Sequence, residues 1–412
     1  MSSSPSRVWV ISELYYPEET STGYFLTGIA EGLAREFSVS VLCSQPTYSR
    51  RGARLARTEL HEGVAIERCW STTLDKDNLM FRAINAVTIS VSIALTALRR
   101  VRAGHVVLVV TNPPLLPFLT AMVCRIRRAR LVLIVHDVYP DVLVVAGMLR
   151  RDSLPSRLSQ RLARWLYRRC DRVVVLGRDM ERLVARAGEL GDAPLALIPN
   201  WGDVDMIRPT DPRANPVLVR LGLEDKFVVQ VMGNMGRTHA VALLLDAARA
   251  LADEPRVHFL FVGAGARTMW LASAIAERGL TNVTQLPACP RGELADHLNA
   301  SDLSAVALLP GMAGVSVPSR LYNILAAGKP VLAIAEPHSE LALVVAEERI
   351  GWVVSPNDCA GVVCAIREAA ASGQALASMG GRARAAAEER YSYESAVARY
   401  LELVTQLAAM GA

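Results

Sequence analysis

The stretch with the clearest chemical meaning is residues 316–330, SVPSRLYNILAAGKP. It predicts a loop, a short helix starting near Pro318, and a stop at Gly328 and Pro330. Proline suits a first helical turn, and glycine suits the position just past a helix end. The positive charge of Arg320 then lies in the first helical turn, at the positive end of the helix dipole, which is unfavourable. Either an anion binds there, held by backbone N–H groups and the guanidinium, or Arg320 is an exposed side chain tolerated at small cost.

A second cation has a similar setting. A predicted strand, 227–232, leads into GNMGRTH at 233–239, and a helical pattern follows. The glycines Gly233 and Gly236 allow a tight turn and close backbone approach, and Arg237 adds a charge at a helix start. Two such cations after strands in one half of the chain favour a shared anion. A diphosphate is the simplest anion large enough for both.

Two stretches of the first half could also carry chemistry. A long polar loop, 13–23, precedes a predicted helix, and its Glu18, Thr22 and Gly23 could approach a phosphate or a sugar. The alternative is an ordinary strand-to-helix connection. Its residues are therefore candidates for a substrate cleft.

The second stretch is the pair His136 and Asp137, which directly follows the predicted strand 131–135. A histidine and an aspartate at a strand end could act as an acid/base pair or orient a hydroxyl group. The alternative is a capped strand end with Asp137 in a turn. Thr111 and Asn112 end another predicted strand and could line the same cleft.

These residues must be positioned by a sheet, because apolar runs of strand length alternate with helix-length segments along the chain. The predicted strands are 8–12, 38–43, 106–110, 131–135, 172–176, 196–198, 227–232, 258–262, 283–286, 303–308 and 331–334. The pattern predicts the α/β class, with two facing Rossmann-like, doubly wound, parallel-sheet domains. Ligands of such sheets bind beyond the carboxyl ends of the strands.

The predicted domain boundary is the turn-rich stretch NWGDVD at 200–205. Residues 1–200 form an N-terminal domain and 201–390 a C-terminal one. An amphipathic helix within 391–412 then packs back toward the N-terminal domain. The sequence Asp203-Val204-Asp205 looks like a metal-holding DxD, but it lies in the linker and follows no buried strand. We therefore predict no metal site.

Composition indicates a globular, core-forming protein, with 51% hydrophobic and 21% charged residues among 412. The seven cysteines show no CxxC or CxH spacing, which argues against zinc and against a disulfide framework. Such usage fits a reducing cytoplasm. The polar residues 1–7 do not resemble a signal peptide.

Charge is unevenly distributed. Residues 1–200 contain 27 lysines and arginines against 18 acidic residues, and the remainder contains 18 against 22. Arginines cluster at 125–130 and 150–172, and 83–98 lacks any charge. That uncharged segment is too short and polar for a comfortable membrane span, so it is either a core helix or an interfacial helix near anionic lipid. We predict peripheral binding to an anionic membrane surface, and no nucleic-acid partner, since no aromatic residues interleave the arginines.

The order and spacing of these motifs resemble retaining glycosyltransferases of family 4, which have the GT-B fold. The resemblance rests on Gly233-Asn234-Met235-Gly236-Arg237, on the linker 198–205, and on 316–330. The loop around Tyr16-Pro17-Glu18 and the run HDVYPD at 136–141 resemble most the colanic-acid and O-antigen branch. That branch builds lipid-linked surface polysaccharides.

The resemblance implies transfer of a sugar from a nucleotide-sugar donor to a saccharide or lipid-linked acceptor, with retention and without a metal or other cofactor. His136 matches the histidine of the N-terminal domain that faces the donor sugar, and His136 and Asp137 are the predicted catalytic residues. Two cations, Arg237 and Arg320, match the residues that hold the diphosphate. The remaining donor-binding positions are Gly233, Asn234, Gly236, Ser316, Pro318, Ser319 and Asn323.

This sequence departs from the family at two positions. Many members carry two glutamates eight residues apart, and here Val315 and Asn323 stand in their places. Asn323 can still bond a ribose hydroxyl, whereas Val315 cannot bond sugar hydroxyls, so backbone groups of Gly314 or Ser316 would have to do so. The alternative function is a catalytically weak nucleotide-binding subunit that scaffolds a partner glycosyltransferase. An epimerase of sugar nucleotides is less favoured, because it has no need of a basic, apolar face.

Overall fold

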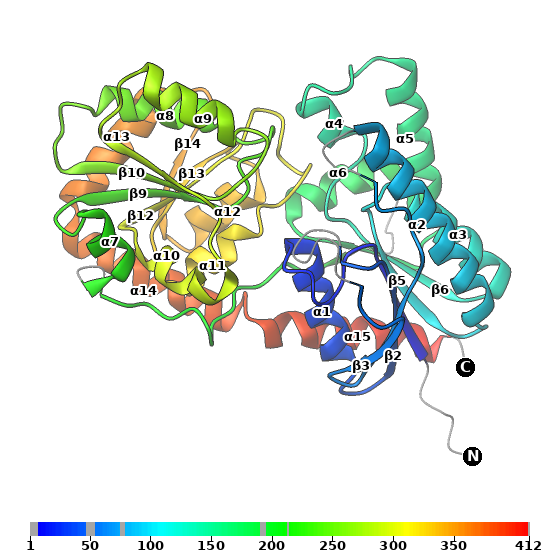
Figure 1. Ribbon diagram of the computed structural model, residues 1–412. Coiled ribbons are helices and arrows are strands. Elements are labelled where there is room, and N and C mark those ends of the chain that lie inside the picture. Colours follow the sequence, from blue (N-terminus) through cyan, green and yellow to red (C-terminus); the bar gives the residue numbers. More distant parts are fainter. Residues whose placement is uncertain (1–6, 47–53, 75–78, 190–194, 212–213, 411–412) are drawn as a thin grey trace. The chain divides into compact units, whose positions relative to one another are not determined.

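The computed structural model (Figure 1) describes residues 7–46, 54–74, 79–189, 195–211 and 214–410. Two compact units emerge from its internal contacts. Unit 1 comprises Met1–Pro140, Arg151–Pro199 and Ala396–Ala412, and unit 2 comprises Asp141–Arg150 and Asn200–Ser395. Each unit has one sheet of its own, with helices on both faces, as the right-handed crossovers of parallel strands require.

Unit 1 is built on an eight-stranded sheet in the order β3-β4-β2-β1-β5-β6-β7-β8, in which only the β3–β4 pair is antiparallel. Its strands are β1 (Arg7–Ile11), β2 (Ser38–Cys43), β3 (Thr58–His61), β4 (Val64–Arg68), β5 (Val106–Val110), β6 (Arg130–Ile134), β7 (Arg172–Val175) and β8 (Leu195–Leu197). Val10 of β1 lies opposite Val41 and Leu108 of its neighbours. These central strands are buried on both faces, which explains their unbroken apolar runs.

The helices of unit 1 fall into two layers. They are α1 (Ser21–Leu33), α2 (Leu79–Arg100), α3 (Leu116–Arg127), α5 (Leu154–Tyr167), α6 (Arg178–Gly188) and α15 (Tyr393–Ala409), the last belonging to unit 1 from Ala396 onward. Right-handed crossovers put α2, α3, α5 and α6 on one face of the sheet and α1 on the other. Helix α15 covers α1, since a Cβ on Gly32 would lie 2.5 Å from the Val397 side chain.

Unit 2 is built on a fully parallel sheet in the order β11-β10-β9-β12-β13-β14. Its strands are β9 (Phe227–Met232), β10 (Val257–Val262), β11 (Val283–Leu286), β12 (Leu303–Ala307), β13 (Val331–Ile334) and β14 (Gly351–Val354). Its helices are α4 (Asp141–Val145), α7 (Pro216–Leu221), α8 (Val241–Ala250), α9 (Thr268–Glu277), η2 (Arg291–Glu293), α10 (Leu294–Asn299), α11 (Arg320–Ala326), α12 (Glu340–Glu347), α13 (Cys359–Ala371) and α14 (Gly373–Glu389). The strand order reverses between β9 and β12, and ligands of such sheets bind beside that point.

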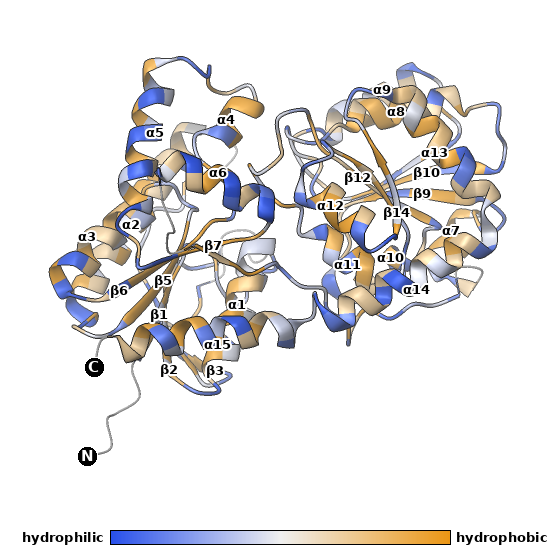
Figure 2. Ribbon diagram, turned by 180° about the vertical axis from the view of Figure 1, so that it is seen from behind, coloured by the Kyte–Doolittle hydropathy of each residue, from blue (hydrophilic) through white to orange (hydrophobic). Residues whose placement is uncertain are grey.

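The predicted fold class, α/β with two doubly wound parallel sheets, is confirmed, and Figure 2 shows the apolar strands at the centre of each unit. Three strands had no counterpart in the prediction. The hairpin β3–β4 is partly exposed and contains charged residues, so it has no clear apolar run. The four residues of β14, GWVV, are apolar but mostly not buried, and the prediction missed them. The helix expected near Pro318 is α11, which starts two residues later, at Arg320, with the Leu321 N–H donating to the Pro318 carbonyl.

Helix α2 (Leu79–Arg100) extends beyond the uncharged segment 83–98 at both ends. Residues Met80–Arg100 are long and apolar enough to cross a membrane by length and composition, yet the helix is tied to unit 1 by its polar side chains. The side-chain amide of Asn85 donates to the Leu74 carbonyl, and Thr72 Oγ1 donates to Asn85 Oδ1. These contacts make α2 a surface helix of the unit, with one side buried and one exposed.

Helix α14 fixes the end of α11 through a close backbone approach. A Cβ on Gly380 would lie 2.3 Å from the carbonyl oxygen of Gly328, the residue that follows α11, whereas a Cβ on Gly381 would meet nothing within 4 Å. The two glycines are adjacent in the same helix, so the same substitution at each of them differs mainly in whether it meets the Gly328 backbone.

We expect Gly380→Ala to destabilise unit 2 by about 1–3 kcal/mol, because the clash is with backbone that cannot move aside. Gly381→Ala should stabilise it by about 0.5–1 kcal/mol, because alanine favours helix and the site is open. Calorimetric unfolding of both variants checks this. Equal melting temperatures for the two would contradict the packing of α14 on α11.

Candidate active site

The loop that leaves β9 is shaped by glycines. Gly233, Gly263 and Gly265 have φ values of +116°, +146° and +154°, a region that residues with a side chain rarely adopt. A Cβ on Gly263 would lie only 2.0 Å from the Gly233 carbonyl oxygen. The loop is also fixed by its backbone, because the Met235 N–H donates to the Ala264 carbonyl at 2.9 Å. The loops after β9 and β10 are therefore interlocked.

Arg320 reaches this loop from the start of α11. Its Nη2 donates to the Asn234 carbonyl at 2.6 Å and lies 3.0 Å from His239 Nε2. A Cβ on Gly233 would lie 3.2 Å from the guanidinium carbon, so Gly233 makes room for Arg320. The structure thus brings together the predicted residues Gly233, Asn234 and Arg320. They lie in the segments that follow β9 and β12, the two strands between which the strand order reverses (the switch point of the sheet).

His239 was not among the predicted site residues. Burial and the charge of Arg320 lower its pKa to about 3, so its imidazole is neutral at neutral pH. Because a guanidinium only donates hydrogen bonds, Nε2 must accept and Nδ1 carries the proton. The sequence offered one signal for His239. Histidine is scarce in this chain, with seven residues, and His239 ends the glycine-containing stretch 233–239. The contact itself joins residues 81 positions apart.

Both predicted cations lack a carboxylate partner. In the part of the chain that the structure describes, no ion pair joins Arg320 or Arg237 to an acidic side chain. Burial lowers the pKa of Arg320 to about 10, which leaves it charged at neutral pH. The Arg237 side chain is exposed. A half-buried guanidinium without a counterion is costly, so the arrangement suits a dianionic or trianionic ligand.

The segment before α11 supplies the rest of the predicted set. Ser319 is the N-cap residue but makes no side-chain capping bond, and Ser316 and Pro318 precede it in the loop. Val315 is only 3% exposed, so its side chain packs into the unit. Asn323 lies one turn after Arg320, and its Oδ1 is buried without a hydrogen-bond partner among the described residues. An unsatisfied buried acceptor fits a ligand hydroxyl.

Other parts of unit 2 hold α11 in place. The Arg384 Nη1 atom donates to the Ala326 carbonyl at 2.7 Å and to the Ile207 carbonyl at 2.6 Å. A Cβ on Gly202 would lie 2.3 Å from the Tyr322 carbonyl oxygen. The helix ends with Gly328 at φ +62° and its N–H on the Leu325 carbonyl, a Schellman-type end.

In unit 1, the start of α1 and two loops meet at the carboxyl edge of the sheet. Thr22 Oγ1, from the first turn of α1, lies 3.3 Å from His136 Nδ1, and the His136 N–H donates to Thr111 Oγ1 at 3.2 Å. Burial lowers the pKa of His136 to about 4, so the imidazole is neutral at neutral pH. It can accept one hydrogen bond and donate another, which suits orienting a hydroxyl group better than carrying a charge.

The remaining predicted residues of this unit lie at the same edge with other roles. Glu18 is 5% exposed, and its backbone carbonyl would lie 2.6 Å from a Cβ on Gly23. The Gly23 N–H donates to Thr20 Oγ1, which caps α1. The Asp137 N–H donates weakly to Thr111 Oγ1 at 3.4 Å. Glu18 and Gly23 therefore shape the loop, while Thr22 faces His136.

Acidic and metal-ligating side chains are not gathered into a site. Among the described residues, no group of three or more histidine, cysteine, aspartate or glutamate side chains could hold a metal ion. Asp203 of the DVD sequence instead contacts Arg291 at 3.6 Å and accepts from the Met206 N–H. Its role in the described structure is to order the linker.

The comparisons with known proteins agree with this geometry. Residues 22–201 match the glycosyl transferase 4-like domain, and residues 219–386 match glycosyl transferases group 1. The probable glycosyltransferase WbjE of Pseudomonas aeruginosa is 30% identical over 403 residues, which cover 98% of each chain. The chain belongs to glycosyltransferase family 4. A second relative of this family 4 protein is the putative colanic acid biosynthesis glycosyl transferase WcaI of Escherichia coli, 26% identical over 88% of this chain and 92% of that one.

Solved structures place the chain among GT-B proteins. Sucrose-phosphate synthase of Thermosynechococcus elongatus has a TM-score of 0.77 at 16% identity and covers 98% of this chain and 100% of its own. HepE of Anabaena, solved with UDP-glucose, has a TM-score of 0.73 at 16% identity and covers 97% and 99%. These likenesses confirm the predicted GT-B fold, while the family matches and the relative in Pseudomonas aeruginosa confirm the predicted family, so the chain is a glycosyltransferase by family.

Proposed function

We propose that this glycosyltransferase moves a sugar from a nucleotide diphosphate-sugar to a saccharide acceptor carried on a lipid, in the synthesis of a surface polysaccharide. Transfer proceeds with retention and without a metal. The observation that carries the proposal is the guanidinium of Arg320, held at the switch point of unit 2 with no carboxylate partner among the described residues. Arg237 lies in the loop that Arg320 contacts and supplies a second positive charge.

The chemistry requires stabilisation of a leaving nucleoside diphosphate. Charge grows on that group as the bond to the sugar breaks, and preorganised cations lower the barrier without a metal. Arg320 and Arg237 fit this role. The acceptor hydroxyl attacks on the face that the diphosphate leaves, and a phosphate oxygen takes its proton. HepE, a structural neighbour, was solved with UDP and with UDP-glucose, which supports a nucleotide-sugar donor.

Asn323 and Val315 bear on the ribose and sugar contacts in unit 2, and His136 bears on a substrate hydroxyl in unit 1. The unpartnered Oδ1 of Asn323 accepts a ribose hydroxyl, in place of the carboxylate that many family members use. Val315 is buried and offers no polar atom, so the backbone of Gly314 or Ser316 contacts the donor sugar. His136, neutral and hydrogen-bonded to Thr22, orients a hydroxyl of a substrate bound at the carboxyl edge of the unit 1 sheet.

The relatives favour an acceptor at the inner surface of a membrane. WcaI is named for colanic acid biosynthesis, and the structural neighbour WaaG is involved in lipopolysaccharide biosynthesis. Polymers of this kind are assembled on lipid carriers. We therefore place the protein in the cytoplasm, bound peripherally to the membrane.

The activity is tested by incubating the purified protein with UDP-, GDP- and dTDP-sugars and measuring nucleotide release. We expect slow hydrolysis of one donor, unchanged by EDTA, because arginines rather than a metal stabilise the leaving group. Binding of a nucleotide without turnover of any donor would favour the alternative, a scaffolding subunit. Loss of turnover in EDTA that added Mg²⁺ restores would contradict the metal-free mechanism.

Arg320→Ala should weaken binding of the nucleoside diphosphate by about 10- to 100-fold, since it removes charge-assisted hydrogen bonds. Binding of the matching nucleoside should change little. Calorimetric titration measures both ligands, and Arg278→Ala, a partly exposed arginine paired with Asp246, is the control. An equal loss for both ligands would show that Arg320 does not contact the phosphates.

His239 is a positioning residue, because its Nε2 orients the Arg320 guanidinium. His239→Ala should weaken diphosphate binding about 10-fold with little effect on the nucleoside, since it frees the guanidinium. His239→Gln should restore most of the affinity, because the amide oxygen can accept from Arg320. A purely structural role predicts instead that both variants lose thermal stability and both ligands bind less well.

A further inference from the structure

Helix α5 exposes a line of large apolar side chains. Leu154, Leu158, Leu162 and Trp165 are spaced four, four and three residues apart, so they lie along one side of the helix. Their exposed fractions are 81%, 58%, 46% and 36%. Single exposed leucines are common on soluble proteins, but an ordered row of this length is not.

The neighbouring helices continue this surface. On α2, the exposed side chains Met80, Ile84, Val87, Val91 and Leu95 also recur at helical spacing. On α3, Met122 and Ile126 are more than half exposed. Phe118 of α3 stacks on Trp165 of α5 at 6.2 Å, and α3 packs against α2. The three helices therefore form one continuous layer on a single face of the unit 1 sheet (Figure 1).

The charge of this layer has one sign. Helices α2, α3 and α5 contain eight arginines and not one aspartate or glutamate. The other helices of the unit, α1, α6 and α15, all contain acidic residues. Arg157 and Arg161 flank the leucine row, and no ion pair is recorded for either within the described ranges.

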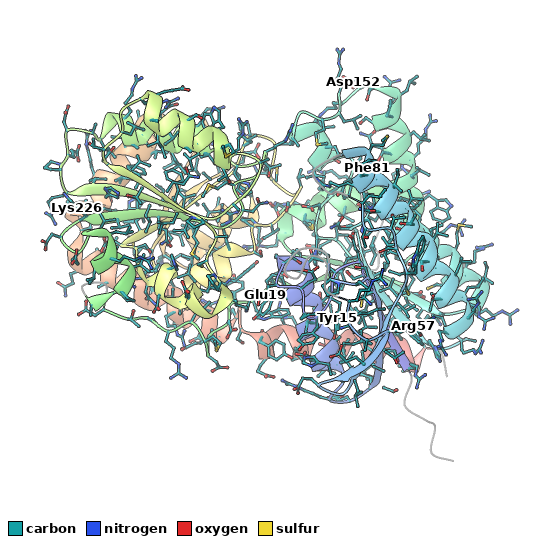
Figure 3. All side chains as sticks on the ribbon, viewed as in Figure 1. Tyr15, Glu19, Arg57, Phe81, Asp152 and Lys226 are labelled. Atoms are coloured by element: carbon teal, nitrogen blue, oxygen red, sulfur yellow. The ribbon has the colours of Figure 1, made fainter. Side chains whose placement is uncertain are left out.

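Among the described residues, α6 on the same face of the sheet adds Asp179 and Glu181, and three acidic residues beside the other helices are paired with arginines. Glu189 binds Arg164 and Arg168, Glu67 binds Arg100, and Asp171 binds Arg130. Asp152, labelled in Figure 3, projects from the turn ahead of α5. The surface around the apolar rows therefore remains basic.

We propose that the face formed by α2, α3 and α5, the arginine–leucine face, docks on a bilayer that contains anionic lipid. Helix α5 lies in the plane of the interface, with its leucine row among the acyl chains and Trp165 at the headgroup level, while the flanking arginines bind lipid phosphates. Helix α2 contributes a second apolar row. It does not cross the membrane, because Asn85 and Thr88 bind the unit on its inner side.

Two other occupants fit less well. A symmetric dimer through this face would place arginines opposite arginines, since the same surface meets itself. A nucleic acid would satisfy the arginines but leave two apolar rows without a partner. The proposal deepens the membrane location in the proposed function and does not depend on catalysis.

The test is flotation of the full chain with vesicles of phosphatidylcholine alone or with 30% phosphatidylglycerol. We expect binding only to the anionic vesicles and release at high salt. Arg157→Gln with Arg161→Gln should weaken binding about 30-fold, as about 1 kcal/mol per arginine implies. Leu158→Gln with Leu162→Gln should weaken it at least 10-fold, because the apolar row no longer inserts.

The control is Arg35→Gln with Arg399→Gln, which removes the same charge from the turn after α1 and from α15, on the opposite face. It should bind almost as the native chain does. Equal loss in the control, binding to neutral vesicles that salt does not affect, or no binding would overturn the proposal. Dimerisation in light scattering that Leu158→Gln abolishes would assign the face to a second copy instead. Donor hydrolysis without vesicles should be unchanged in all variants, so failure of the face and failure of the activity are separable.

Discussion

The candidate site of unit 2 depends on one steric constraint: the guanidinium carbon of Arg320 lies 3.2 Å from the position that a Cβ on Gly233 would take, closer than a side chain there would normally allow. The absence of a Cβ there lets a cation approach the backbone of a loop that follows a different strand. That loop, in turn, needs Gly263 and Gly265, whose own Cβ atoms would collide with it. The glycines after β9 and β10 and the arginine after β12 therefore depend on one another. The glycines allow the two loops to approach closely, and Arg320 contacts the first of these loops.

The same constraint explains how much of the unit serves to hold α11. The helix has only seven residues, too few to be stable by itself. Its carbonyl end is bound by Arg384, its flank is met by the linker at Gly202, and its exit is fixed by Gly380 of α14. The linker residues thus help to set the position of Arg320, besides connecting two units. Asn323 gains its place on the same face of α11, one turn from the guanidinium.

The sequence was sufficient for the fold class, because the parallel strands are buried and their apolar runs are unbroken. It also singled out two cations for their expected place at a helix start, where they oppose the dipole. Arg320 is the first residue of α11, whereas Arg237 lies four residues before α8, and their roles in binding stay predictions. The sequence did not indicate His239, whose significance comes from a contact with a residue 81 positions away. Nor did it show that Glu18 is buried, or that Val315 packs inward, because burial is decided by tertiary packing rather than by local pattern.

The geometry of a parallel sheet separates the two functions that we propose for unit 1. Its strands end at the carboxyl edge, where Thr22, Thr111 and His136 meet. Its crossover helices lie on the faces, and α2, α3 and α5 share one of them. A bilayer that covers this face leaves the edge uncovered, because edge and face are roughly perpendicular surfaces of the same sheet. The arginine–leucine face contains no predicted site residue, so selection could give it charge and apolar area without altering the residues that contact the substrate.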